Sequence, residues 1–164
     1  MAVKATGAMA RHALPKGPLT MARKTLGRDP LLELDLFAEC TPAEARHLRS
    51  LLTLLNVAAG TELISGGSYG FEFLVIAAGQ AEVSIETVSG PVVVATLEAG
   101  EFAGEMSLLG RQRRSATVTA TTPLTVYVAN SAEFATILEE APSVAAKIRA
   151  AASARQEANR SLAA

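Results

Sequence analysis

The sequence of 164 residues predicts a mainly β protein, an eight-stranded antiparallel jelly-roll β-barrel with flanking helices. Two observations predict this class. From Val57 to Val128 the chain consists of short apolar or alternating runs separated by turns, which is typical of antiparallel barrels. On both sides of this region apolar residues recur every three or four positions, which is the periodicity of amphipathic helices.

The first helix is predicted to begin after Thr41. The run Thr41-Pro42-Ala43-Glu44 is a capping box with proline at the first helical position. Apolar residues follow at helical spacing, namely Ala45, Leu48, Leu51, Leu52 and Leu55. This spacing predicts a helix that continues to about Asn56.

The strands are predicted where the period changes to short runs. Glycine, proline or serine turns stand between these runs, including Gly66-Gly67 and Ser89-Gly90-Pro91. The clearest predicted strands are Glu62–Ile64, Phe73–Ala77, Ala81–Glu86, Val92–Leu97, Ala116–Ala120 and Leu124–Val128. The layout is therefore one helix, roughly eight strands and two helices.

The two helices after the barrel are predicted from a second capping box and a proline. Asn130-Ser131-Ala132-Glu133 begins the first of them, and Glu140-Ala141-Pro142 ends it. An alanine-rich segment from Ser143 to about Leu162 then has strong helix propensity and an apolar stripe that includes Val144 and Ile148.

Composition excludes several classes of protein. Hydrophobic residues make up 49% of the chain and charged residues 19%, which predicts a folded domain. No apolar run approaches the eighteen residues that a membrane span needs, so we expect no span. Cys40 is the single cysteine, and we interpret it as a small buried residue of a protein in the reducing cytoplasm.

The charge is distributed unevenly along the chain. Residues 1–28 hold six basic and no acidic side chains, whereas the remaining 136 residues hold 9 basic and 16 acidic ones, a net charge of −7. We predict a flexible basic tail over residues 1–28 and one domain over residues 29–164. Such a tail leaves nonspecific contact with nucleic acid or an acidic membrane open, but we favour a solvated tail.

One segment, residues 104–118, indicates a binding chemistry. It begins with Gly104 and Glu105, passes through one apolar turn, and ends with Arg114 and small residues. A carboxylate accepts hydrogen bonds from sugar hydroxyls, and a guanidinium and helix-start amides bind phosphate. The segment lacks the spacing of triphosphate and dinucleotide loops, so it favours a ligand with a sugar at one end and a single negative charge at the other.

The same residues resemble a known family. Phe102-Ala103-Gly104-Glu105 and Arg114-Ser115-Ala116-Thr117 resemble the two ends of the phosphate-binding cassette of cyclic nucleotide-binding domains. These domains are the cAMP and cGMP sensors of kinase regulatory subunits, channels and Crp-type transcription factors. Leu97-Glu98-Ala99-Gly100 resembles the turn before the cassette, and residues 67–83 resemble a glycine-rich strand motif of the family. The resemblance covers roughly residues 30–150.

The resemblance implies a ligand site and its contacts. We expect a short helix over Met106–Leu109, Glu105 to accept from the ribose 2′-hydroxyl, and Arg114 to neutralise the cyclic phosphate. Ser115 beside the arginine favours cAMP, with cGMP as the alternative. The expected ligand-binding residues are Gly104, Glu105, Met106, Ser107, Arg114, Ser115 and Ala116.

Three positions depart from the family pattern. Ser68 and Phe71 stand where acidic residues are usual, in a turn that we expect to have little effect on the ligand. Arg113 stands where proline is usual, and it could move or duplicate the phosphate contact.

The resemblance also implies that the last helix closes over the pocket and transmits the signal. Candidate lid residues lie between Ile148 and Asn159, on or near the apolar stripe: Ile148, Arg149, Ala152 and Arg155. The output would be a partner protein, a homodimer through the alanine-rich helix, or sequestration of the nucleotide.

Other functions have weaker support. A metal enzyme on this architecture needs several histidines in the barrel, and His12 and His47 both lie outside it, so we expect no catalysis, metal or cofactor. A Crp-like DNA-associated regulator continues into a helix-turn-helix, whereas this sequence stops at Ala164, so we expect no sequence-specific nucleic-acid binding. A non-catalytic interaction module with a degenerate pocket remains the main alternative.

Overall fold

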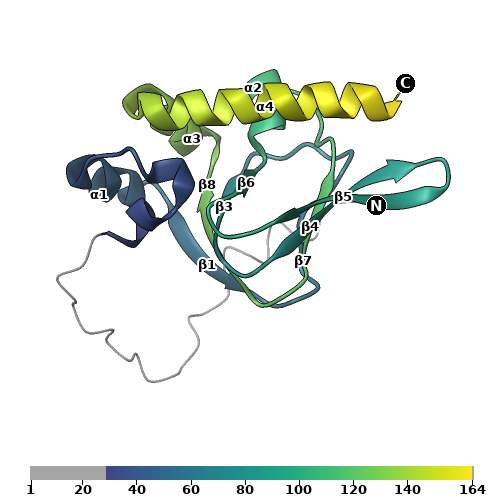
Figure 1. The fold of residues 1–164 in the computed structure, drawn as a ribbon, viewed down its shortest axis with the longest axis horizontal. Helices are drawn as coiled ribbons and strands as arrows, with labels where there is room; N and C mark the ends of the chain where they lie inside the picture. The colour runs from purple at the N-terminus through teal and green to yellow at the C-terminus, as the bar shows by residue number, and fades with distance from the viewer. Residues whose placement is uncertain (1–28, 164) are drawn as a thin grey trace.

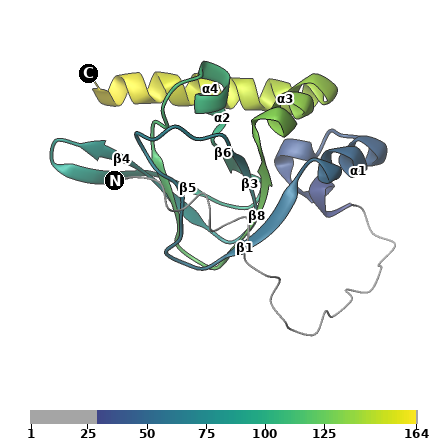
Figure 2. The same cartoon turned by 180° about the vertical axis from the view of Figure 1, so that it is seen from behind.

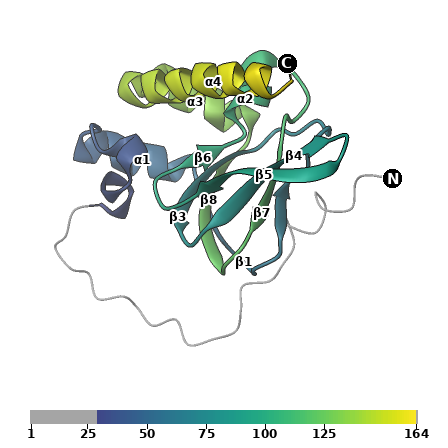
Figure 3. The same cartoon turned by 45° about the vertical axis from the view of Figure 1, so that its right-hand side comes forward.

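Two four-stranded antiparallel sheets form the body of the protein in a computed structural model that describes residues 29–163. The first sheet has the order β1-β8-β3-β6 and the second β2-β7-β4-β5. Figures 1 and 3 show the strands wrapping around a shared interior with the helices gathered at one end. The strands are β1 Thr53–Val57, β2 Glu62–Ile64, β3 Phe73–Ala78, β4 Ala81–Thr87, β5 Gly90–Leu97, β6 Phe102–Ala103, β7 Thr117–Ala120 and β8 Leu124–Ala129. The predicted eight-stranded jelly-roll class is confirmed.

The helices lie before, within and after the strands. Two 3-10 turns precede α1, and α2 interrupts the barrel between β6 and β7. The bounds are η2 Pro30–Glu33, η3 Asp35–Phe37, α1 Pro42–Ser50, α2 Glu105–Gly110, α3 Ser131–Glu140 and α4 Pro142–Ala163. None of the helices described here has the length and apolar character needed to cross a bilayer. The predicted tail of residues 1–28 lies outside the described residues.

Both predicted capping boxes are confirmed. The side chain of Thr41 accepts from the Glu44 amide at 3.2 Å, and the Glu44 carboxylate accepts from the Thr41 amide at 2.7 Å. Asn130 and Glu133 make the equivalent pair of hydrogen bonds at 2.8 and 2.9 Å. These contacts satisfy amides that a helix start would otherwise leave unpaired.

The predicted end of the first helix is wrong. Helix α1 ends at Ser50, and Thr53–Val57 forms strand β1 instead of continuing the helix to Asn56. The five residues of β1 pair in register with β8, from Thr53 opposite Val128 to Val57 opposite Leu124. This pairing with a strand distant in sequence outweighs the local helical spacing of the leucines.

Helix α4 lies across one end of the barrel, as Figures 1 and 2 show from opposite sides. Its first half packs into a core formed with α1, α3 and the 3-10 turns, where Val144 and Ile148 are fully buried. A second core fills the space between the sheets and includes Ile76, Val118 and Val126. The first core therefore fixes the start of α4 to the barrel, and its later turns extend towards β4 and β5.

Cys40 is buried, as the sequence predicted. Its sulfur lies 4.0 Å from the hydroxyl oxygen of Ser143 at the start of α4. Burial raises the pKa of this thiol above its ordinary value, which keeps it in the neutral form.

The attachment of α4 can be tested by replacing two of its side chains with alanine. We expect Ile148→Ala to lower the free energy of unfolding by about 2–5 kcal/mol, because Ile148 is 0% exposed and its loss leaves a cavity. We expect Leu162→Ala, at a residue that is 58% exposed, to change it by less than about 0.5 kcal/mol. Urea denaturation measures both values. Equal costs for the two changes would contradict the burial of the first half of α4.

Candidate functional site

A cavity of about 340 Å³ opens between the barrel, α2 and the last turns of α4. All seven residues that the sequence predicted as ligand-binding line this one cavity: Gly104, Glu105, Met106, Ser107, Arg114, Ser115 and Ala116. The opposite wall is apolar and comes from β4, β5 and β7, with Val83, Ile85, Val94, Leu97 and Val118. The cavity therefore has a polar end at α2 and an apolar end beside β4 and β5.

Gly104 allows α2 to begin inside the barrel. It is the N-cap residue of α2 and has a φ of 97°, a conformation that residues with a side chain rarely adopt. A Cβ here would also collide with the carbonyl oxygen of Glu72. The predicted short helix over Met106–Leu109 is confirmed as Glu105–Gly110, and the amides of its first turn have no carbonyl partner within the helix.

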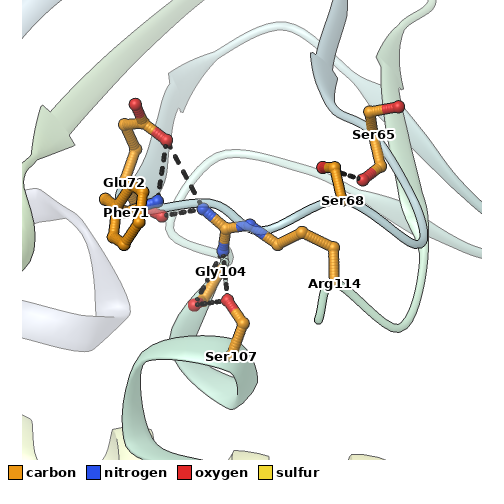
Figure 4. A network of polar contacts seen from close by, with 7 residues as sticks. All are labelled: Ser65, Ser68, Phe71, Glu72, Gly104, Ser107 and Arg114. Carbon is orange, nitrogen blue, oxygen red and sulfur yellow. Dashed lines mark hydrogen bonds and ion pairs between the residues drawn. The ribbon is translucent and has the colours of Figure 1, made fainter. Parts of the chain in front are cut away.

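Arg114 is buried at the polar end, with 5% of its surface exposed. Its Nη1 donates to the Gly104 carbonyl at 2.9 Å and to the Ser107 hydroxyl at 2.8 Å, and its Nη2 donates to the Glu72 carbonyl at 2.7 Å. Figure 4 shows these contacts converging on the guanidinium. Three of its five N–H donors are thus held by the protein.

The charge of Arg114 has compensating partners. Burial lowers the pKa of the guanidinium, and the negative charges of Glu72 and Glu105 oppose this shift. The Glu72 carboxylate lies 3.6 Å from Nη2 of Arg114. Because arginine stays protonated in proteins, the site keeps a buried positive charge beside α2.

The segment before β3 encloses this arginine, a contact that the sequence alone did not predict. The Gly67 amide donates to the Arg114 carbonyl and the Arg114 amide to the Ser68 carbonyl, both at 2.8 Å. A Cβ on Gly70 would collide with Nε of Arg114. Glu72 and Gly70 therefore help to position Arg114 without lining the cavity, and the sequence alone did not identify either. The available signal was an acidic residue directly after Phe71, one position beyond the usual place.

Glu105 is also buried, with 1% of its surface exposed. Its Oε1 accepts a hydrogen bond from Nη1 of Arg155 on α4 at 2.6 Å. The Arg155 Nη2 donates to the Phe102 carbonyl at 2.8 Å, and the guanidinium lies 5.0 Å from the centre of the Phe102 ring. This ion pair ties the second half of α4 to the polar end of the cavity.

The four candidate lid residues on α4 lie in three different environments. Arg155 lines the cavity, and so does Asn159 one turn later. Ile148 belongs to the core under the helices. Arg149 and Ala152 line a different cleft, between α2 and α4.

Ser115 and Arg113 have different environments although both flank Arg114. The Ser115 hydroxyl is exposed to the cavity and lies 3.8 Å from the Met106 sulfur, a weak acceptor that a stronger one can replace. Arg113 is outside the cavity lining. Its Nη1 donates to the Gly67 carbonyl at 2.9 Å, and its guanidinium lies 4.4 Å from the centre of the Tyr69 ring. The possibility that Arg113 duplicates the anion contact has no support in this arrangement.

The arrangement suits a ligand with three different parts. A buried carboxylate can accept from hydroxyls, a buried guanidinium with nearby amides can bind an anion, and the apolar wall can cover a flat ring. Within residues 29–163 no cluster of histidine, cysteine and carboxylate side chains is placed to hold a metal ion.

Comparisons with known proteins agree with this arrangement. The model of the cyclic nucleotide-binding domain family matches residues 54–141. The acetyltransferase Pat of Mycolicibacterium smegmatis is 34% identical over 108 residues, which are 66% of this chain and 32% of that protein. A cAMP-dependent protein kinase regulatory subunit of Yarrowia lipolytica is 37% identical over 107 residues, 65% of this chain and 28% of that protein.

A solved structure extends the similarity to the fold. The catabolite activator protein of Thermus thermophilus superimposes with a TM-score of 0.67 and 25% identity, over 82% of this chain and 61% of that chain. The present chain spans about a third or less of the two curated relatives above.

A double-mutant cycle measures the interaction energy of the ion pair between Arg155 and Glu105. We expect Arg155→Ala to lower the free energy of unfolding by about 1–3 kcal/mol, because it leaves the Glu105 carboxylate buried without its partner. The lower part of that range is expected, since the Arg155 side chain is 34% exposed. In a Glu105→Gln background the same change should cost less. Urea unfolding of the four proteins without nucleotide gives the coupling, and a coupling of zero would contradict the pair.

Proposed function

The chain belongs to the cyclic nucleotide-binding domain family, and from this membership we propose that its cavity binds cAMP and that the domain acts as a sensor without catalytic activity of its own. The main observation in support is the placement of two buried, oppositely charged side chains, Glu105 and Arg114, in the lining of one cavity. The cavity volume of about 340 Å³ lies within the range of small-molecule sites, roughly 300–1,000 Å³.

Each part of a cyclic nucleotide has a proposed contact. Glu105 accepts from the ribose 2′-hydroxyl through the oxygen that Arg155 does not occupy. The phosphate binds the Arg114 guanidinium, which lines the cavity, together with the Ser115 hydroxyl and the Ala116 amide. The base lies against the apolar wall of Val83 and Val94.

We propose cAMP rather than cGMP as the main ligand. The relative from Yarrowia lipolytica is by name a regulatory subunit of a cAMP-dependent kinase. Ser115 directly after Arg114 also resembles the cAMP-selective bacterial members of the family.

The proposed signal passes through α4. The ribose hydroxyl and Arg155 would share the buried Glu105 carboxylate. Nucleotide binding would therefore change the strength of the ion pair that joins α4 to the start of α2. Binding would thereby shift an existing equilibrium between positions of α4. The proposed receiver is a partner protein or a second copy of the chain, and the proposed location is the cytoplasm, which suits the free thiol of Cys40.

The role of Arg114 is tested by calorimetric titration with cAMP and cGMP. We expect Arg114→Ala to weaken cAMP binding by about tenfold to more than a hundredfold, because a buried charge-assisted contact contributes roughly 1.5–3 kcal/mol. Arg113→Ala is the matched control, since this neighbouring arginine lies outside the cavity lining, and it should bind nearly as the parent does.

Circular dichroism of both variants separates loss of binding from loss of fold. A folded Arg114→Ala protein with an unchanged dissociation constant would refute the proposed phosphate contact. A folded parent that binds neither nucleotide would favour an interaction module with a degenerate pocket.

The role of Glu105 is tested with the ligand rather than the protein alone. We expect 2′-deoxy-cAMP to bind about tenfold to a hundredfold more weakly than cAMP, because its ribose leaves the buried carboxylate with one partner fewer. In Glu105→Gln the difference between the two ligands should shrink. Equal affinities of the parent for both ligands would show that the hydroxyl does not bind Glu105.

A further inference from the structure

Two aromatic side chains are exposed in the loop between β2 and β3. Tyr69 is 62% exposed and Phe71 is 63% exposed. The other five aromatic residues of the chain are all buried, namely Phe37, Phe73, Phe102, Tyr127 and Phe134. Single exposed apolar residues are common on protein surfaces, but two rings in one short loop form a cluster that a binding partner can cover.

Positive charge lies beside these rings. The guanidinium of Arg113 is 4.4 Å from the centre of the Tyr69 ring, and Arg111 is exposed two residues earlier. In the part of the chain that the structure describes, neither arginine takes part in an ion pair. The one acidic residue of the loop is Glu72, and its carboxylate lies beside the buried Arg114. The surface therefore combines exposed rings with positive charge.

The residues of this surface include all three departures from the family pattern. Phe71 and Ser68 stand where acidic residues are usual, and Arg113 stands where proline is usual. Relative to that pattern, this chain has lost two negative charges and gained one positive charge at the same place. The change favours an acidic partner over a basic one.

The loop is held in place from behind. The Gly67 amide and the Ser68 carbonyl are hydrogen-bonded to the backbone of Arg114, and Nη1 of Arg113 donates to the Gly67 carbonyl at 2.9 Å. Figure 4 shows Ser68 and Phe71 on the segment that runs past the Arg114 side chain. A partner would therefore meet a preorganised surface, which lowers the entropy cost of binding.

We propose that the surface formed by Tyr69, Phe71 and Arg113 binds a short acidic segment of another protein. Aromatic residues and arginine are enriched at the centres of protein–protein interfaces. A carboxylate of the partner pairs with the guanidinium, and an apolar side chain covers the rings. A long nucleic acid is disfavoured, because residues 29–164 carry a net charge of −7 and repel a polyanion beyond this surface. Binding at this surface does not require cAMP.

The test begins with a phage-displayed library of random short peptides selected on the full protein. We expect the enriched peptides to carry more acidic than basic residues and at least one aromatic or large aliphatic residue, because the arginine needs an anion and the rings need apolar contact. A synthetic peptide of the most enriched sequence then serves as the probe in calorimetric titrations. Enriched sequences without an acidic excess would overturn the proposal.

Substitutions locate the binding site of this probe. We expect Tyr69→Ser, Phe71→Ser and Arg113→Glu each to weaken its binding by about tenfold or more. Leu54→Ser is the matched control, because Leu54 is a large apolar residue on β1 that is 52% exposed, and it should leave the affinity unchanged. An affinity that the three loop variants retain, or that the control lowers equally, would refute the proposed surface.

A charge exchange separates direct pairing from a structural effect. A second peptide, in which lysine replaces every acidic residue of the probe, should bind Arg113→Glu more tightly than it binds the parent protein. A merely structural role of Arg113 would weaken both peptides and would contradict direct pairing.

Two further measurements distinguish this proposal from the others. Labelled oligothymidylate that binds more tightly than the probe, and loses this binding in Tyr69→Ser, would replace the acidic segment with single-stranded nucleic acid. Arg113→Ala should weaken the probe and leave the affinity for cAMP nearly unchanged, since Arg113 lies outside the cavity lining. Failure of the nucleotide site and failure of the loop surface are thus observed separately.

Discussion

The burial of the Arg114 guanidinium is the constraint on which the rest of the site depends. A buried cation is stable only if its donors and its charge have partners, and three separate segments supply them: Glu72 before β3, Gly104 after β6 and Ser107 in α2. The absence of side chains at Gly70 and Gly104 leaves room for the guanidinium to approach the backbone. The hydrogen bonds of this one side chain therefore join α2 to the segments around β3 and β6 at the polar end of the cavity.

The sequence predicted the parts of the fold and site that are encoded locally. Both capping boxes, most strands and the seven cavity residues follow from spacing or from the motif around Glu105 and Arg114. The parts that it did not predict depend on distant partners. Thr53–Val57 has helical spacing but pairs with β8, more than sixty residues away. Likewise, β6 is too short to show a period, and the contacts of Glu72 and Arg155 exist only because the fold brings remote segments together.

Helix α4 has two halves with different environments. The half around Val144 and Ile148 is buried in the helical core. The later half lines the cavity with Arg155 and Asn159 and carries the exposed Leu162 in its last turn. Buried apolar contacts hold the first half irrespective of any ligand. The second half is held mainly by the Arg155 contacts with Glu105 and the Phe102 carbonyl, so we expect its opening to require less free energy than unfolding of the domain.

In the proposed function, Glu105 binds both Arg155 and the ribose hydroxyl, which would couple the nucleotide to any protein that recognises α4. If cAMP alters how firmly Arg155 is held, thermodynamic reciprocity requires that a protein which captures the freed end of α4 alter the affinity for cAMP by the same factor. The apparent dissociation constant of the nucleotide would then be a property of the assembly and not of the isolated chain. The concentration of the binding protein would set the level of cAMP at which the sensor responds.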